Sequence, residues 1–114
     1  MSTTQAVLDH HLQAIGAGDV PALLLDYSED SVLLTPNGPL KGLKALGEFF
    51  GGFGTAMPDF MDGFRMLRQE VVGDVAYIVW ESPKYVLLGT DTFVIRNGRI
   101  VTGGCRRGRS GPLR

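Results

Sequence analysis

The chain has 114 residues, of which 44% are hydrophobic and 20% charged, as expected for one globular domain with its own core. Its formal net charge of −1 argues against a nucleic-acid-binding protein. The single cysteine, Cys105, excludes an internal disulfide and a thiolate metal cluster within one chain. The first residues contain no Lys or Arg and no apolar h-region, so we expect no signal peptide, no membrane partner and a cytoplasmic location.

Charge is unevenly distributed along the sequence. The last stretch carries Arg106, Arg107, Arg109 and Arg114 and no acid, which leaves 7 basic against 12 acidic residues elsewhere. Arginines without an aromatic platform are typical of a solvated chain end, so no nucleic-acid partner is expected. Because this stretch is poor in apolar residues, we predict one domain over residues 1–103 and a basic, disordered tail over residues 104–114.

The first half of the sequence predicts three helices. An apolar stripe at i, i+3, i+4 and i+7 indicates an amphipathic helix that begins near Ser2 or Thr3; its members are Leu8, His11, Leu12 and Ile15. Asp19 and Pro21 favour the start of a second, short helix that reaches about Tyr27. A third helix is expected over residues 43–53.

The second half predicts strands over residues 64–72, 75–84, 90–96 and 99–102, after a short strand at 31–35 that ends in the turn 36–39. Gly73-Asp74 and Asn97-Gly98 each separate two strands by two residues, the spacing of antiparallel hairpins. Helices followed by such strands predict an α+β fold, with the helices packed on one face of a curved antiparallel sheet.

Two residues stand out as candidates for chemistry. His11 lies within the apolar stripe of the first helix, whereas His10 lies about a hundred degrees around it on a more polar side. Asp91 shares a strand face with Phe93 and Ile95, so its carboxylate points toward the apolar side. Burying an unpaired carboxylate costs several kcal/mol, so Asp91 belongs in a pocket, in a polar pair, or at a solvated sheet edge.

The order of several short motifs resembles the nuclear-transport-factor-like superfamily, and within it the SnoaL-like and ketosteroid-isomerase-like proteins. The motifs are Gly18-Asp19 with Ala22-Leu23, then residues 27–32, Gly38 to Gly42, Gly89 to Phe93, and Asn97 to Ile100. The resemblance implies a cone in which a curved sheet wraps around the N-terminal helical segment, a cystatin-like α+β barrel. It also implies an apolar cavity and a homodimer through the sheet.

Alignment with ketosteroid isomerases places His11 where the family has an oxyanion-donating tyrosine, and Asp91 where it has a protonated aspartic acid. Tyr27 and Phe50 match supporting pocket positions. Thr35, before Pro36, replaces the aspartate that acts as general base, and a hydroxyl has no useful basicity near neutral pH. Steroid isomerisation is therefore not expected, which leaves a His11–Asp91 dyad as the candidate catalytic pair.

Further residues are expected to line the pocket: Phe53, Met57, Phe60, Trp80 and Phe93, together with Tyr27, Thr35 and Phe50. The glycine-rich run at 51–54 follows a helix and lacks the Lys-Ser/Thr ending of a phosphate loop. Only two histidines are present and they are adjacent, so neither a metal nor another cofactor is expected. Relatives continue the last strand with apolar residues, whereas Gly103-Gly104 here predict that it ends near Thr102.

Two functions remain open on the sequence. In the first, the pocket binds a small hydrophobic organic molecule and acts as an isomerase, cyclase, hydrolase or dehydratase through His11 and Asp91. In the second, the same fold is a non-catalytic ligand-binding or dimerisation module, a reading favoured by the missing base at Thr35.

Overall fold

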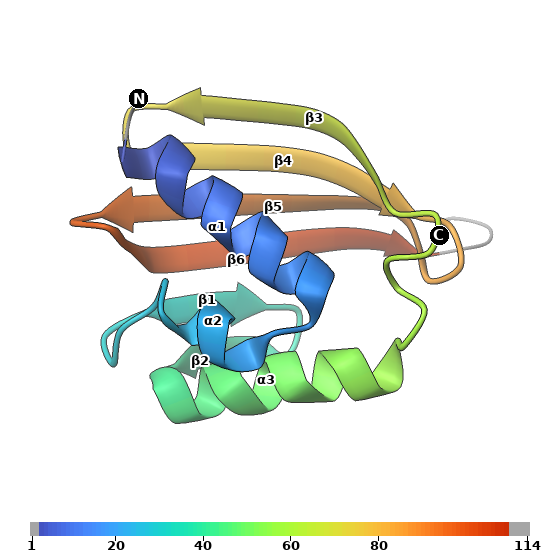
Figure 1. Ribbon diagram of the computed structural model, residues 1–114, viewed down its shortest axis with the longest axis horizontal. Coiled ribbons are helices and arrows are strands. Elements are labelled where there is room, and N and C mark those ends of the chain that lie inside the picture. Colours follow the sequence, from blue (N-terminus) through green and yellow to red (C-terminus); the bar gives the residue numbers. More distant parts are fainter. Residues whose placement is uncertain (1–2, 110–114) are drawn as a thin grey trace.

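The computed structural model describes residues 3–109, and over these residues the chain forms three helices and six strands (Figure 1). The helices are α1 (Thr3–Ala17), α2 (Val20–Leu24) and α3 (Leu43–Ala56). The strands are β1 (Val32–Thr35), β2 (Gly38–Lys41), β3 (Arg65–Val72), β4 (Val75–Ser82), β5 (Val86–Arg96) and β6 (Arg99–Arg109). None of the helices in this described part is long and apolar enough to cross a membrane.

The strands form one curved, open sheet in the order β2-β1-β6-β5-β4-β3, and the helices lie on one of its faces (Figure 1). This arrangement confirms the predicted α+β fold. The sheet is mixed, however, because β1 pairs with β6 in parallel, and the prediction of a purely antiparallel sheet was wrong. Two-residue turns force antiparallel neighbours, whereas the long path from β1 to β6 through α3 and four strands permits a parallel pair.

The turn between α1 and α2 is set by two residues. Gly18 has a φ of +66°, a left-handed conformation that suits glycine at a helix end. Asp19 then caps α2, because its side chain accepts a hydrogen bond of 3.1 Å from the backbone N–H of Ala22. The sequence predicted the role of Asp19 at the start of α2.

The segment around residues 36–42 differs from the prediction, which placed a turn at 36–39 and no strand after it. Pro36 and Asn37 alone make the turn, and Gly38–Lys41 return as β2. Pro39 is tolerated because β2 is the edge strand of the sheet, where a missing N–H need not break a ladder. The Pro and Gly content of this segment therefore predicted only a turn, although part of it forms a short strand.

The hairpin turns follow the sequence prediction. Asn97 and Gly98 have φ values of +52° and +77°, as a type I′ turn requires at both central positions. Gly73, with a φ of +57°, connects β3 to β4. Its carbonyl accepts a hydrogen bond of 2.8 Å from Oγ1 of Thr4, which fixes the start of α1 over this hairpin.

The last strand is longer than the predicted 99–102. β6 extends to Arg109 and pairs with β5 along its length, from Arg96↔Arg99 to Val86↔Arg109. Backbone hydrogen bonds to β5 order this polar stretch without any need for an apolar side-chain pattern. Gly103 also allows Leu33 to pack closely against β6, because a Cβ at residue 103 would lie 3.2 Å from Cδ1 of Leu33. Residues 110–114 of the predicted tail lie outside the described residues.

Candidate functional site: an apolar cavity with two polar groups

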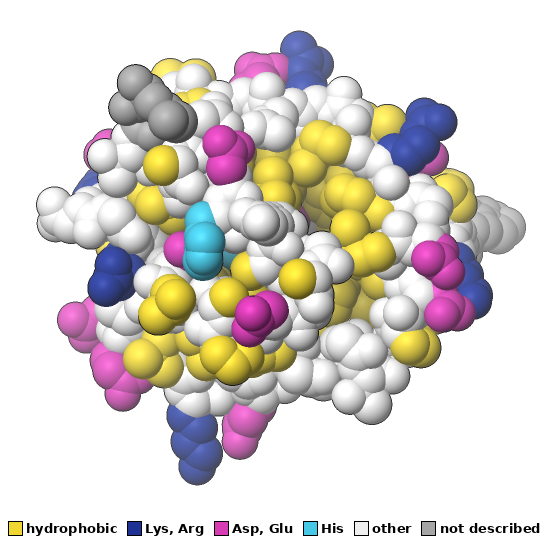
Figure 2. All heavy atoms as spheres, in the orientation of Figure 1, with side chains coloured by type: hydrophobic (Ala, Val, Ile, Leu, Met, Phe, Trp, Pro, Cys, Tyr) yellow, Lys and Arg dark blue, Asp and Glu magenta, His cyan; other side chains and the backbone are white. Residues whose placement is uncertain are grey.

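A cavity of about 90 Å³ lies between α1, α3 and the concave face of the sheet. Figure 2 shows a hollow with hydrophobic side chains along its wall on the face that Figure 1 presents. Its lining is mostly aliphatic and aromatic: Leu12, Ile15, Leu33, Phe49, Phe50, Phe53, Phe60, Phe64, Ile78, Trp80 and Phe93, with Gly104. The polar side chains among the lining residues are His11, Tyr27 and Asp91.

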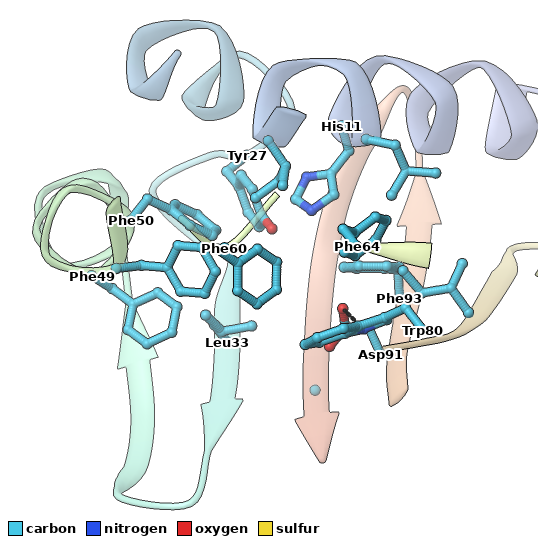
Figure 3. Close-up of a pocket in the computed structure, with 15 residues that line it drawn as sticks. His11, Tyr27, Leu33, Phe49, Phe50, Phe60, Phe64, Trp80, Asp91 and Phe93 are labelled. Carbon is cyan, nitrogen blue, oxygen red and sulfur yellow. Dashed lines mark hydrogen bonds between the residues drawn. The ribbon is translucent and has the colours of Figure 1, made fainter. Parts of the chain in front are cut away.

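The structure brings most of the predicted site residues to this cavity. His11 points into it from α1, while Trp80 and Asp91 face it from the sheet (Figure 3). Six of the residues expected to line a pocket do line it: Tyr27, Phe50, Phe53, Phe60, Trp80 and Phe93. Strand periodicity gave the direction of Phe93, as it did for Asp91, whereas Tyr27 and Phe50 were expected from the family resemblance.

Thr35 and Met57 do not line this cavity. Thr35 belongs to the β1–β2 hairpin, where its Oγ1 donates a hydrogen bond of 2.8 Å to the carbonyl of Gly38 and accepts one from the N–H of Asn37. A threonine before a two-residue turn satisfies the turn's own backbone groups. Met57 instead lines a second, neighbouring cavity.

That second cavity, of about 480 Å³, lies between the end of α1 and the last turns of α3. Four side chains separate it from the first: Ile15, Phe50, Phe53 and Phe60 line both. Although it is larger, its lining contains no titratable side chain. Any acid–base chemistry therefore belongs to the smaller cavity.

Several lining residues were not predicted, namely Leu12, Ile15, Leu33, Phe49, Phe64, Ile78 and Gly104. Leu12 and Ile15 could have been predicted, because they belong to the same apolar stripe of α1 as His11. Ile78 was likewise on the strand face of Trp80. Phe64 was placed at the start of a predicted strand, but it precedes β3, where strand alternation does not set the direction of its ring.

His11 is deeply buried, with 5% of its surface exposed. Aromatic rings surround the imidazole, with ring centroids 5.0 Å away at Phe93, 6.0 Å at Tyr27 and 6.3 Å at Phe50, all edge to face. Its Nδ1 has no hydrogen-bond partner among the described residues. Leaving a buried polar atom unsatisfied costs about 1–3 kcal/mol, so the fold keeps this imidazole in the wall of the cavity at a cost in stability.

Burial, together with the smaller effect of the nearby His10, lowers the pKa of His11 to about 4. The imidazole is consequently neutral near pH 7, with one nitrogen as donor and the other as acceptor. A neutral imidazole can donate a hydrogen bond to a carbonyl or accept one from a hydroxyl. It carries no positive charge with which to hold an anion.

Asp91 is held by Trp80. The indole Nε1 of Trp80 donates a hydrogen bond of 3.1 Å to Oδ2 of the carboxylate, as the dashed line in Figure 3 marks. The two side chains lie on adjacent strands, β4 and β5, and both line the cavity. The dyad between His11 and Asp91 stays a prediction.

His10 forms a different pair outside the cavity. Its Nδ1 lies 2.8 Å from Oδ2 of Asp26, a residue that is only 6% exposed. The His10 side chain itself is 43% exposed, as its place on the polar side of α1 predicted. Among the described residues, no three His, Cys, Asp or Glu side chains gather where they could hold a metal ion.

A curved sheet with a helix across its concave face and an apolar cavity between them defines the nuclear-transport-factor-like class of fold. Within that class, the sequence profile of the SnoaL-like domain matches residues 8–102. The chain belongs to the SnoaL-like family. No curated protein gives a significant sequence match.

Solved structures with the same fold are similar over nearly the whole chain. A SnoaL-like protein of unknown function from Burkholderia thailandensis is 19% identical, with a TM-score of 0.80 over 93% of this chain and 95% of that one. An NTF2-like protein of unknown function from Cytophaga hutchinsonii is 12% identical, with a TM-score of 0.75 over 95% and 92%. A candidate polyketide cyclase from Sinorhizobium meliloti is 18% identical, with a TM-score of 0.73 over 93% and 100%. These similarities establish the fold alone.

Proposed function

We propose that the smaller cavity binds a small, largely apolar organic molecule whose polar group reaches His11 and Asp91. The observation that carries this proposal is that His11 and Asp91, two polar side chains, line an otherwise largely apolar cavity in which aromatic rings surround the imidazole. Apolar walls with a few convergent polar groups are typical of small-molecule sites. The cavity volume of about 90 Å³ suits a molecule built around a single ring.

The chemistry we propose uses His11 as a neutral hydrogen-bonding group. A pKa of about 4 makes the imidazole a weak base at pH 7, whereas a neutral N–H can stabilise negative charge that develops on a substrate oxygen. Reactions open to such a donor together with a carboxylate are isomerisation, cyclisation, dehydration and hydrolysis. One structural neighbour is a candidate polyketide cyclase, which makes cyclisation a reaction to include in a screen.

A second candidate is a non-catalytic ligand-binding module. Two observations favour it: the pKa of His11 lies well below the operating range of a general base, and Thr35 is occupied within its own hairpin turn rather than in the cavity. Neither observation argues against binding. The two candidates therefore share the cavity and differ only in turnover.

One experiment tests binding and then separates the candidates. Binding of p-cresol and acetophenone is measured by NMR titration with the wild type, with His11→Leu and with the matched variant His10→Leu, whose side chain lies outside the cavity. We expect His11→Leu to weaken binding of both compounds and His10→Leu to preserve it. Wild-type protein that binds neither compound would contradict the proposed site.

Turnover is then screened with single-ring ketones, epoxides and hydroxy ketones, using the wild type, His11→Leu and Asp91→Asn. Product formation that both variants lose supports the enzyme. Ligand binding without product from any compound supports the binding module instead.

We also propose that the outer face of the sheet contacts a second copy of the chain. Val75 and Tyr77, which are 39% and 37% exposed, project from β4 on the side opposite to Ile78 and Trp80. Large apolar side chains on a strand face favour such a contact. Light scattering of the wild type and Tyr77→Asp tests it: we expect a dimer that the substitution dissociates, and a wild-type monomer at high concentration would exclude it.

A further inference from the structure

We propose that Trp80 is the positioning residue for Asp91, that Gly89 makes its position possible, and that the cavity consequently selects molecules with a hydroxyl group. The proposal rests on the function proposed above, because it concerns how the carboxylate of the cavity meets a ligand. It assigns roles to two residues that do not belong to the His11–Asp91 pair.

The strand register places the indole beside the carboxylate. Trp80 pairs with Gly89 across β4 and β5, and Ile78 pairs with Asp91. Trp80 and Asp91 are thus diagonal neighbours on one face of the sheet, a separation that aromatic side chains can span. The ladder is regular from Ile78↔Asp91 to Trp80↔Gly89 and shifts register only beyond it, between Trp80 and Ser82, so the diagonal is set by regular strand pairing.

Gly89 leaves the space that the indole occupies. A Cβ at this residue would lie 2.4 Å from Cζ2 and 2.5 Å from Cε2 of Trp80, far inside van der Waals contact. The φ of Gly89 is not in the left-handed region, so backbone conformation does not require glycine here. Glycine is required here because the indole ring needs the space, and the ring lies directly over the backbone of β5.

Two phenylalanines hold the ring from the other elements. Phe60 meets the indole edge to face, with ring centroids 5.2 Å apart, and Phe64 stacks on it at 5.7 Å. Phe60 is itself fixed to β4, because Oγ of Ser82 donates a hydrogen bond of 2.5 Å to its carbonyl. With the backbone of β5 beneath it and these rings beside it, the indole has one direction in which to present its N–H.

The polarity of this hydrogen bond determines what the carboxylate can do. An indole nitrogen is a donor only, so Oδ2 of Asp91 is the acceptor. A carboxylate has about four acceptor sites, so one oriented by an indole can also accept a hydrogen bond from a bound hydroxyl. A methyl group of the same size offers no such hydrogen, and the site therefore distinguishes the two.

The test compares p-cresol with p-xylene, which differ by a hydroxyl in place of a methyl group. Dissociation constants are measured by NMR for the wild type, Trp80→Phe, Asp91→Asn and the double variant, with Thr92→Val on the opposite face of β5 as the matched control. We expect Trp80→Phe and Asp91→Asn each to reduce the preference for p-cresol about tenfold. The double variant should lose no more than either single one.

The ratio of the dissociation constants for p-cresol and p-xylene reports on how Asp91 is positioned. A general loosening of the cavity would weaken the binding of both compounds and leave this ratio unchanged. A Trp80→Phe protein that keeps the wild-type ratio overturns the proposal. Gly89→Ala, which keeps both Trp80 and Asp91 but displaces the ring, provides a second variant if Trp80→Phe does not fold, and should lower the ratio in the same direction.

Failure of the proposed function would be recognised separately. If the wild type binds neither compound, the ¹³C signal of the Asp91 carboxyl group is compared between the wild type, Trp80→Phe and Gly89→Ala. A shift of this signal in the variants, absent in Thr92→Val, supports the positioning role without any ligand. An unchanged signal overturns it.

Discussion

Nδ1 of His10 lies 2.9 Å from Oδ1 and 2.8 Å from Oδ2 of Asp26, so one ring nitrogen meets both carboxylate oxygens. This contact joins α1 to the segment that follows α2. The backbone of Asp26 also reaches the sheet, because its carbonyl accepts a hydrogen bond of 2.7 Å from the N–H of Ile100. Asp26 therefore connects a helix, a loop and β6 at one position.

The first prediction concerns the titration of Asp26. Burial raises the pKa of this carboxyl, whereas the hydrogen bond from His10 acts to lower it. In His10→Ala we expect the pKa of Asp26 to rise further, because the opposing interaction is lost. NMR titration of the Asp26 carboxyl carbon measures it. The control is Gln13→Ala, on the exposed surface of α1; equal titration in His10→Ala and the wild type would contradict the prediction.

The second prediction concerns stability against pH. The folded-state pKa of His11, about 4, lies below the ordinary value of about 6.5, so the unfolded chain binds the proton more readily. The contribution of neutral His11 to the free energy of unfolding is fully present above about pH 6.5 and is lost as the pH falls toward 4. Urea unfolding at pH 7.5 and 4.5 should show about 2–3 kcal/mol of this loss in the wild type.

In His11→Phe this part of the pH dependence should disappear, while His10→Gln should retain it. Other groups titrate over the same range, so the difference between variants, rather than the total change, is the quantity compared. The same loss in His11→Phe as in the wild type would show that His11 does not cause it.

The third prediction concerns the start of α3. The N-cap of this helix is Gly42, which has no side chain to cap it, and Glu29 supplies the missing acceptor. Its Oε1 accepts a hydrogen bond of 2.7 Å from the N–H of Leu43, at the positive end of the helix dipole. We expect Glu29→Ala to lower the free energy of unfolding by about 1 kcal/mol.

The matched control for this prediction is Asp30→Ala, which removes an adjacent exposed acid. Chemical denaturation at neutral pH and low salt compares the two. Equal effects would show that general charge, rather than the cap, determines the result.

The fourth prediction concerns two glycines within α3. Gly51 and Gly52 are exposed, and a Cβ at either residue would meet nothing within 4 Å. Alanine is preferred over glycine in a helix interior by about 1 kcal/mol per residue, so each substitution should raise the free energy of unfolding by about that amount. Gly47→Ala, where a Cβ would lie 3.4 Å from Cδ1 of Leu24, should gain less. Thermal unfolding that shows no gain for Gly51→Ala would contradict the prediction.

The sequence was sufficient for features that depend on local pattern. The spacing of Leu8 and His11 predicted the buried side of α1, and Asn97-Gly98 predicted the hairpin between β5 and β6. The alternation of Asp91 and Phe93 predicted that both side chains point to the concave face. Each of these follows from the period of a helix, the period of a strand or the φ requirement of a turn.

Features that depend on contacts distant in sequence could not be predicted in the same way. The length of β6 depends on backbone pairing with β5, which Gly103 and Gly104 do not signal. The pair His10–Asp26 depends on the course of the segment after α2. The hydrogen bond from Trp80 to Asp91 depends on the register between two strands.

Gly89 has a consequence for the evolution of this family. Because any Cβ at residue 89 would collide with the indole of Trp80, the two residues are under a joint constraint. Homologues that keep tryptophan at position 80 should keep glycine at position 89, and those with a larger residue at 89 should have a smaller ring or an aliphatic residue at 80. An alignment of SnoaL-like sequences would show this as covariation between two positions nine residues apart, with Asp91 retained chiefly where the tryptophan is present.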